Sequence, residues 1–310
     1  MAKSYSSIAR QLSRRELLRL ALGAGALALN GMTMAAESLI RRPIPRTGEF
    51  LPVIGLGTWQ TFDVAESERA LLGRVLSEFV RLGGKVVDSS PMYGRSEIVV
   101  GDLAAKLGLH KQLFLATKVW TSGRDDGIHQ MEESYQRLRT ERMDLMQIHN
   151  LVDWRTHLVT LRRWKERGKT RYLGVTHYTE SAYDELARVL EAEELDFVQL
   201  NYSIAERTAE RRLLPLAAKR RVAVLINRPF AEGALFRKVR GKPLPPWAAE
   251  IGAASWAQFF LKFVVSHPAV TCAIPATSKF EHLVDNMQAG VGALPDVATR
   301  ERMVRYLDEL

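Results

Sequence analysis

The sequence predicts an α/β protein built on a single (β/α)8 TIM barrel, with an N-terminal β-hairpin before the barrel and a C-terminal closing helix after it. The main observation is that short apolar runs alternate with longer amphipathic stretches along most of the chain. The eight apolar runs are VIGLG (53–57), KVVDSS (85–90), LFLATKV (113–119), MDLMQIH (143–149), YLGVTH (172–177), FVQLNYS (197–203), VAVLIN (222–227) and TCAIPA (271–276). Near-continuous apolar strands separated by helices are typical of a parallel sheet covered on both faces. Eight such units favour a closed barrel over a doubly wound sheet.

The segments around these runs have the patterns expected of the other elements. They predict a hairpin over 44–55, helices that include 68–84 and 248–267, and a closing helix over 295–310. The hairpin is expected to turn at Thr47-Gly48, because a glycine there accepts the backbone conformation of a tight turn. No linker-like composition interrupts residues 44–310, so we expect one barrel domain over that range.

The first 36 residues have the pattern of a targeting signal rather than of a folded element. A basic head containing Arg14 and Arg15 precedes LALGAGALALNGMTMA (20–35), which carries no charge. Paired arginines before such a segment predict a twin-arginine signal peptide over residues 1–36, read by the export machinery, and hence a periplasmic protein. Without that signal the protein would be cytoplasmic. An uncleaved membrane anchor is the alternative, which the glycines and Asn30 disfavour.

Composition limits the classes of function. The 310 residues are 46% hydrophobic and 25% charged, which is typical of a globular protein with a sizeable core. The formal net charge is +9, but residues 1–36 hold five basic residues against Glu16 alone, and the remaining excess is dispersed. We therefore predict no nucleic-acid partner, and membrane contact only through the signal segment. Cys272 is the single cysteine, so neither an internal disulfide nor a cysteine-based metal cluster is possible.

Ionisable side chains follow the second, third and fourth predicted strands. Asp88 and Tyr93 come from VVDSSPMYG, Lys118 from LATKV, and His149 from MQIH. Each has a simple structural explanation, such as a helix cap or a buried polar contact. In a barrel, however, the C-terminal ends of all strands meet at one face, where active sites lie. We therefore predict that the four side chains form one site.

These residue types suggest acid–base chemistry on an oxygen atom. An ammonium beside a phenol favours the phenolate, and a buried carboxylate keeps that ammonium charged. Asp88 is thus expected to hold Lys118, and Lys118 to lower the pKa of Tyr93, while His149 donates a hydrogen bond to the same oxygen. The set contains too few metal ligands for a metal site, and no serine-hydrolase nucleophile elbow occurs. Protonation of a carbonyl oxygen suits a reduction whose hydride comes from a cofactor.

With these contexts the chain resembles the aldo/keto reductase superfamily from about Ile44 to about Gly292. RTGEFLPVIGLGTW, VVDSSPMYG, LATKVW, MQIHN, QLNYS and IPATSKFEHLVDN are each similar to a motif of that family. The resemblance implies a catalytic tetrad of Asp88, Tyr93, Lys118 and His149. It also implies an NADPH-dependent oxidoreductase that reduces an aldehyde or ketone to an alcohol, with Tyr93 as the general acid.

The resemblance also implies cofactor contacts. They are Thr58 near the ribose and pyrophosphate, Thr176 and Gln199 at the carboxamide, Thr277, Ser278 and Lys279 around the 2′-phosphate, and Asn286 near the adenine. Asn227 stands where the family usually has the aromatic residue that stacks on nicotinamide, and Arg228 follows it. Arg228 is assigned to the pyrophosphate or to an acidic substrate. His282 replaces a frequent arginine, so Lys279 is the main charge that favours NADPH over NADH.

The substrate and two other functions stay open at this stage. Trp59, Met92 and Trp120 lie just beyond strand ends and either line a pocket for a small carbonyl compound or pack the barrel rim. A cofactor-binding sensor or accessory subunit with little turnover is the alternative function, but it would not need a tuned phenol. A barrel isomerase or phosphate-sugar enzyme is disfavoured, because no glycine-rich phosphate loop follows the last two strands.

Overall fold

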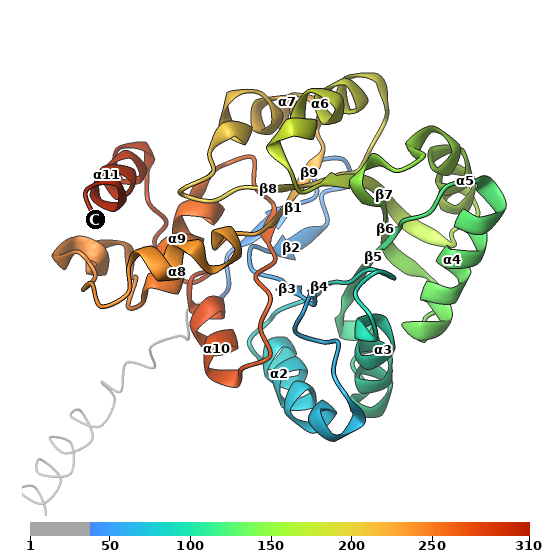
Figure 1. Cartoon of the computed structure of the whole chain (residues 1–310), viewed down its shortest axis with the longest axis horizontal. Helices are drawn as coiled ribbons and strands as arrows, with labels where there is room; N and C mark the ends of the chain where they lie inside the picture. The colour runs from blue at the N-terminus through green and yellow to red at the C-terminus, as the bar shows by residue number, and fades with distance from the viewer. Residues whose placement is uncertain (1–37) are drawn as a thin grey trace, which may run out of the picture. The chain divides into compact units, whose positions relative to one another are not determined.

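Eight parallel strands form the centre of the computed structural model, which describes residues 38–310 (Figure 1). They are β3 Leu56–Gly57, β4 Val86–Asp88, β5 Phe114–Val119, β6 Met143–Ile148, β7 Thr170–His177, β8 Phe197–Asn201, β9 Ala223–Asn227 and β10 Cys272–Ala273. Each strand pairs with its neighbour in the sequence, from β3 to β10. Seven of the eight predicted runs contain one of these strands and the run 172–177 overlaps β7, which begins two residues earlier, so the predicted (β/α)8 architecture is confirmed.

The first and last strands close the barrel through single bridges rather than a continuous ladder. Ile54 pairs with Ala273 and Gly57 pairs with Ala276, both in parallel. A Cβ atom on Gly57 would lie 2.7 Å from the carbonyl oxygen of Ile274, so only glycine permits this approach.

Helices cover the outside of the barrel (Figure 1). They are α2 Arg69–Arg81, α3 Ser96–Leu107, α4 Arg124–Arg137, α5 Trp154–Glu166, α6 Tyr183–Ala192, α7 Leu213–Arg220, α9 Trp256–Ser266 and α10 Phe280–Gln288, with the short α8 Ala234–Lys238 in the connection after β9. In this part of the chain no helix combines the length and apolarity needed to cross a membrane. The predicted signal over residues 1–36 lies outside the described residues.

The hairpin closes the floor of the barrel. Strand β1 Arg41–Pro43 pairs antiparallel with β2 Phe50–Pro52, and Gly48 in the connection has a φ of 76°. Its side chains Ile44 and Leu51 belong to the cluster that fills the barrel interior with Val86, Phe114, Ala116, Leu145, Tyr172, Phe197, Ala223, Leu225, Cys272 and Ile274. The predicted hairpin is therefore present and supplies part of the core.

Of two other predicted helices, one is confirmed and one is divided. The closing helix is α11 Val297–Asp308, and its Arg300 donates hydrogen bonds to the carbonyl oxygen of Phe263 and to the Tyr202 hydroxyl. The pattern over 248–267 was expected to form one helix, but it is divided. A 3-10 turn ends at Gly252, whose φ of 62° stops the helix, and α9 begins after the N-cap Ser255.

Candidate active site

Alternation along the strands places a polar layer directly above the apolar interior. Successive side chains on a strand point to opposite faces, so residues two apart share a face. Val86, Ala116, Leu145, Phe197 and Leu225 belong to the interior cluster. The next inward positions are Asp88, Lys118, Gln147, Gln199 and Asn227. The strands therefore end in carboxylate, ammonium and amide groups at one mouth of the barrel.

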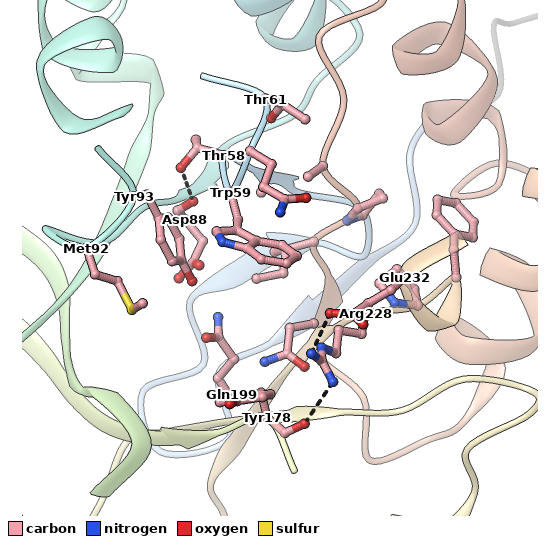
Figure 2. Close-up of a pocket in the computed structure, with 18 of the residues that line it drawn as sticks. Thr58, Trp59, Thr61, Asp88, Met92, Tyr93, Tyr178, Gln199, Arg228 and Glu232 are labelled. Carbon is pink, nitrogen blue, oxygen red and sulfur yellow. Dashed lines mark hydrogen bonds and ion pairs between the residues drawn. The ribbon is translucent and has the colours of Figure 1, made fainter. Parts of the chain in front are cut away.

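A cavity of about 690 Å³ opens at this layer (Figure 2). Its walls include Thr58, Asp88, Tyr93, His149, Gln199 and Arg228 from the predicted site, together with Asn150, Tyr178, Asn227, Phe230, Glu232 and Phe236. Trp59, Met92 and Trp120 also line it, and each is about two-fifths exposed. The structure therefore places these three side chains in the cavity wall.

Asp88 and Lys118 form a buried ion pair next to the cavity. Lys118 Nζ lies 2.6 Å from Asp88 Oδ2 and donates a second hydrogen bond to the Ser89 carbonyl oxygen at 2.7 Å. The lysine is fully buried and Asp88 is 2% exposed. Burial alone would lower the pKa of Lys118, but the Asp88 carboxylate and the Tyr93 oxygen raise it above its ordinary value. Lys118 is therefore a permanent cation below Tyr93.

Tyr93 meets that cation from the cavity wall. Lys118 Nζ lies 5.0 Å from the centroid of the Tyr93 ring. Burial raises the pKa of Tyr93, and the charge of Lys118 lowers it by less, so the net direction is upward. The sequence argument that Lys118 gives the phenol a lowered pKa is therefore wrong in its net sign for this structure. Desolvation of the phenolate outweighs the neighbouring ammonium, and Tyr93 keeps its proton at neutral pH.

His149 stands beside the phenol and is neutral. Its ring centroid lies 6.0 Å from that of Tyr93 in an edge-to-face arrangement. Burial and the charge of Lys118 lower the pKa of His149 to about 3. Nδ1 of the imidazole lies 3.2 Å from the Ser90 hydroxyl oxygen, and within residues 38–310 Nε2 makes no hydrogen bond. Because His149 lines the cavity, its unpaired Nε2 is available to a ligand there.

Sequence reasoning missed Ser90 and Gln147 as parts of the site. Gln147 Nε2 donates to Asp88 Oδ1 at 3.1 Å, so the carboxylate has one partner on each oxygen. Alternation could have found both residues, since Ser90 follows Asp88 by two positions and Gln147 precedes His149 by two. Their contacts span 59 residues of sequence, however, and only the barrel brings them together.

The residues predicted to contact a cofactor occupy two regions. Thr58, Gln199 and Arg228 line the cavity, and the Thr58 hydroxyl donates to the Asp88 carbonyl oxygen at 3.0 Å. The others lie outside the cavity wall. Thr176 is buried near the end of β7, Thr277 is buried in the segment between β10 and α10, and Asn286 is buried on α10. Ser278 and Lys279 are exposed before α10. The Lys279 backbone N–H donates to the Thr277 hydroxyl at 3.1 Å, which shapes this turn.

Three buried amide atoms of residues that line the cavity lack a partner within residues 38–310: Asn150 Oδ1, Gln199 Nε2 and Asn227 Oδ1. Gln199 Nε2 and Asn227 Oδ1 are both shielded from solvent and make no hydrogen bond. They stand on the adjacent strands β8 and β9, whose register pairs Gln199 with Leu225. Unpaired buried polar atoms are costly, so such a donor and acceptor suit a ligand group that offers one of each. A carboxamide is such a group.

The sequence and the fold of this chain are similar to those of known proteins. The model of the aldo/keto reductase family matches residues 53–301. Methylglyoxal reductase YeaE of Escherichia coli (strain K12) is 29% identical over 243 residues, which cover 76% of this chain and 84% of the relative. An aldo/keto reductase from Klebsiella pneumoniae, solved with NADP and acetate, is 26% identical with a TM-score of 0.72, over 84% of this chain and 93% of that one. Another from that organism, solved with NADPH, is 25% identical with a TM-score of 0.73, over 87% and 95%.

Proposed function

The chain belongs to the aldo/keto reductase family, and we propose that it reduces an aldehyde or ketone to an alcohol with NADPH as hydride donor. The observation that carries the proposal is the buried Asp88–Lys118 pair beneath Tyr93 at the cavity that His149 also lines. Similar solved proteins bind NADP or NADPH, and the first-named relative is a methylglyoxal reductase. A small carbonyl compound is therefore the substrate class that we infer.

The residues of this chain fit a nicotinamide cofactor. Gln199 Nε2 and Asn227 Oδ1 offer the cavity a donor and an acceptor without partners, which matches a carboxamide. Lys279 is exposed, and its ammonium has no carboxylate partner within residues 38–310. It is therefore free to bind a 2′-phosphate. We assign Thr58, Thr176, Thr277, Ser278 and Asn286 to the remaining contacts. NADH is the less favoured cofactor because it lacks the group that Lys279 would bind.

The proposed proton transfer uses Tyr93 and the two groups beside it. NADPH held by these residues would supply the hydride that the carbonyl carbon accepts. Tyr93 gives its phenolic proton to the carbonyl oxygen, which suits a group whose pKa is raised and which is therefore protonated at neutral pH. Lys118 stabilises the phenolate left behind, and neutral His149 donates a hydrogen bond from Nε2 to the same oxygen. Water at the cavity mouth then returns the proton to Tyr93.

Tyr93→Phe tests this function, because it keeps the ring and removes only the hydroxyl. We expect unchanged folding, NADPH binding within about twofold by fluorescence quenching, and turnover of a simple aldehyde lowered by roughly 10²–10⁴. Lys118→Met should give a similar loss, since the phenolate loses its nearest cation. The two losses should not add in the double variant, because the residues act as one unit.

The same measurements separate the reductase from the sensor alternative. A protein that binds NADPH but oxidises it with no aldehyde would support a cofactor-binding sensor. Near-parental turnover in Tyr93→Phe would show that the phenol is not the acid. If the protein bound neither NADPH nor NADH, both the reductase and the sensor hypotheses would be wrong.

We propose further that residues 1–36 are a twin-arginine signal and that 44–310 is the domain that it exports to the periplasm. The support is the Arg14–Arg15 pair ahead of an uncharged segment. Replacing both residues with lysine should leave full-length, folded protein in the cytoplasm, as seen by cell fractionation. Arg10→Lys with Arg19→Lys is the matched control and should export normally. Normal export of the Arg14/Arg15 variant would remove the assignment.

A further inference from the structure

Arg228 is the one cationic side chain in the wall of the cavity, within the described part of the chain. It follows β9 with a φ of 50°, a left-handed conformation that is costly for a residue with a side chain. Figure 2 shows it with Tyr178 and Glu232 at the end of the drawn cavity opposite Tyr93 and Asp88. A strained backbone that carries a cation into a mainly apolar cavity points to a binding role.

The guanidinium is held in place but keeps free donors. Its Nη2 pairs with Glu232, its Nη1 donates to the Tyr178 carbonyl oxygen at 3.4 Å, and its Cζ lies 4.6 Å from the centroid of the Tyr178 ring. An arginine has five N–H donors in a planar fork, so three remain for another partner. A carboxylate needs two of them for a bidentate contact. Glu232 is half-exposed, so an incoming anion competes with a solvated carboxylate rather than with a buried one.

Arg228 lines the same cavity as Tyr93, the proposed proton donor. Its charge is one of those that lower the pKa of Tyr93, so its field reaches the phenol across the cavity. The side chains of Trp59 and Trp120, which also line the cavity, carry no charge. A substrate whose carbonyl oxygen meets Tyr93 would therefore present its far end to Arg228.

We propose that Arg228 is a carboxylate-binding subsite and that the preferred substrates are short carbonyl compounds with a carboxylate remote from the carbonyl. This inference rests on the proposed reductase function. Glu232 weakens the subsite because its carboxylate already pairs with Nη2 of the guanidinium. The guanidinium could bind the oxyanions of a cofactor pyrophosphate in the same way. The experiment therefore has to distinguish a substrate carboxylate from the cofactor pyrophosphate.

The test compares 4-oxobutanoate with its neutral methyl ester in the NADPH-loaded protein. We expect the parental protein to prefer the acid in kcat/KM by at least about tenfold. Arg228→Met should lower this acid-to-ester ratio by about 10–100-fold, mainly through KM, the scale of a charge-assisted hydrogen bond. Arg228→Lys should give an intermediate ratio, because it keeps the charge without the fork. Glu232→Gln should raise the ratio, since it removes the competing carboxylate.

Controls and a binding measurement keep the proposal separate from the reductase function. Arg237→Met is the matched control: it removes a nearby exposed arginine that does not line the cavity, and the ratio should stay parental. Succinate binding to the NADP-loaded protein, followed by tryptophan fluorescence, should be lost in Arg228→Met even if neither aldehyde is reduced. An equal loss of NADPH and NADH affinity with an unchanged acid-to-ester ratio would assign Arg228 to the pyrophosphate. No preference for the acid and no succinate binding by the parental protein would overturn the subsite.

Discussion

Individual side chains in the cavity are set by partners that they meet only in the folded barrel. The Asp88 carboxylate receives Lys118 on one oxygen and Gln147 on the other, so its orientation is fixed. This geometry keeps a lysine charged at a position where burial favours the neutral amine. The cation then stands ready to stabilise a phenolate on Tyr93, which is a requirement of the proposed proton transfer.

At the same scale, Ser90 should determine which nitrogen of His149 carries the proton. The imidazole is neutral, and a serine hydroxyl that donates to Nδ1 leaves the hydrogen on Nε2, where the substrate oxygen needs it. Ser90→Ala should lower kcat about fivefold, the equivalent of one net hydrogen bond of about 1 kcal/mol, with little change in KM. The ¹⁵N shifts of His149 should move toward a mixture of tautomers.

Ser89→Ala is the control for this tautomer signature, because the Ser89 hydroxyl contacts Thr58 rather than His149. Its His149 ¹⁵N shifts should match those of the parental protein. Identical shifts in Ser90→Ala would mean that another group fixes the tautomer.

Among the elements, two glycines on neighbouring helices differ in the space available for a side chain. On α3, a Cβ atom at Gly101 would lie 2.0 Å from the carbonyl oxygen of Arg137 at the end of α4, so the two helices pack backbone to backbone. On α2, a Cβ atom at Gly73 would meet its nearest neighbour, Leu103, at 3.4 Å, an ordinary contact. Helix geometry alone gives both sites the same preference for alanine.

Alanine substitutions at these two sites should therefore change stability in opposite directions. Gly101→Ala should lower the free energy of unfolding by about 1–3 kcal/mol, because α3 has to move away from α4. Gly73→Ala should raise it by up to about 1 kcal/mol through lower chain entropy in the unfolded state. Urea midpoints measured side by side would check both. Equal shifts in the same direction would contradict the packing of α3 on α4.

For the whole molecule, buried neutral histidines make the barrel sensitive to acid. Burial, together with nearby positive charge, lowers the pKa of His149 to about 3 and that of His267 to about 4. The unfolded chain takes up protons at these sites near pH 6.5. Between that pH and about 3 to 4 the unfolded state binds protons that the folded state does not bind. The free energy of unfolding therefore falls as the pH is lowered through this window.

Denaturation between pH 7 and 4.5 should show this loss directly. His149 alone contributes up to about 1.4 kcal/mol per pH unit below 6.5. His149→Gln should flatten the pH dependence, because the unfolded chain no longer gains that proton. His129→Gln is the control, since His129 is exposed on α4 and its replacement should leave the slope unchanged. A parental slope in His149→Gln would contradict the neutral imidazole.

The amino-acid sequence by itself determined the barrel and four members of the candidate site, Asp88, Tyr93, Lys118 and His149. Apolar alternation and strand order are local properties, and they predicted β3 to β10 and the convergence of Asp88, Lys118 and His149, whose side chains the structure brings to one mouth. Tertiary structure alone decided what depends on distance through space. Burial reversed the expected direction of the Tyr93 pKa, Gly252 divided a helix that periodicity had joined, and contacts 59 residues apart brought in Ser90 and Gln147. Desolvation and side-chain contacts of this kind arise from neighbours remote in the chain, so no local pattern contains them.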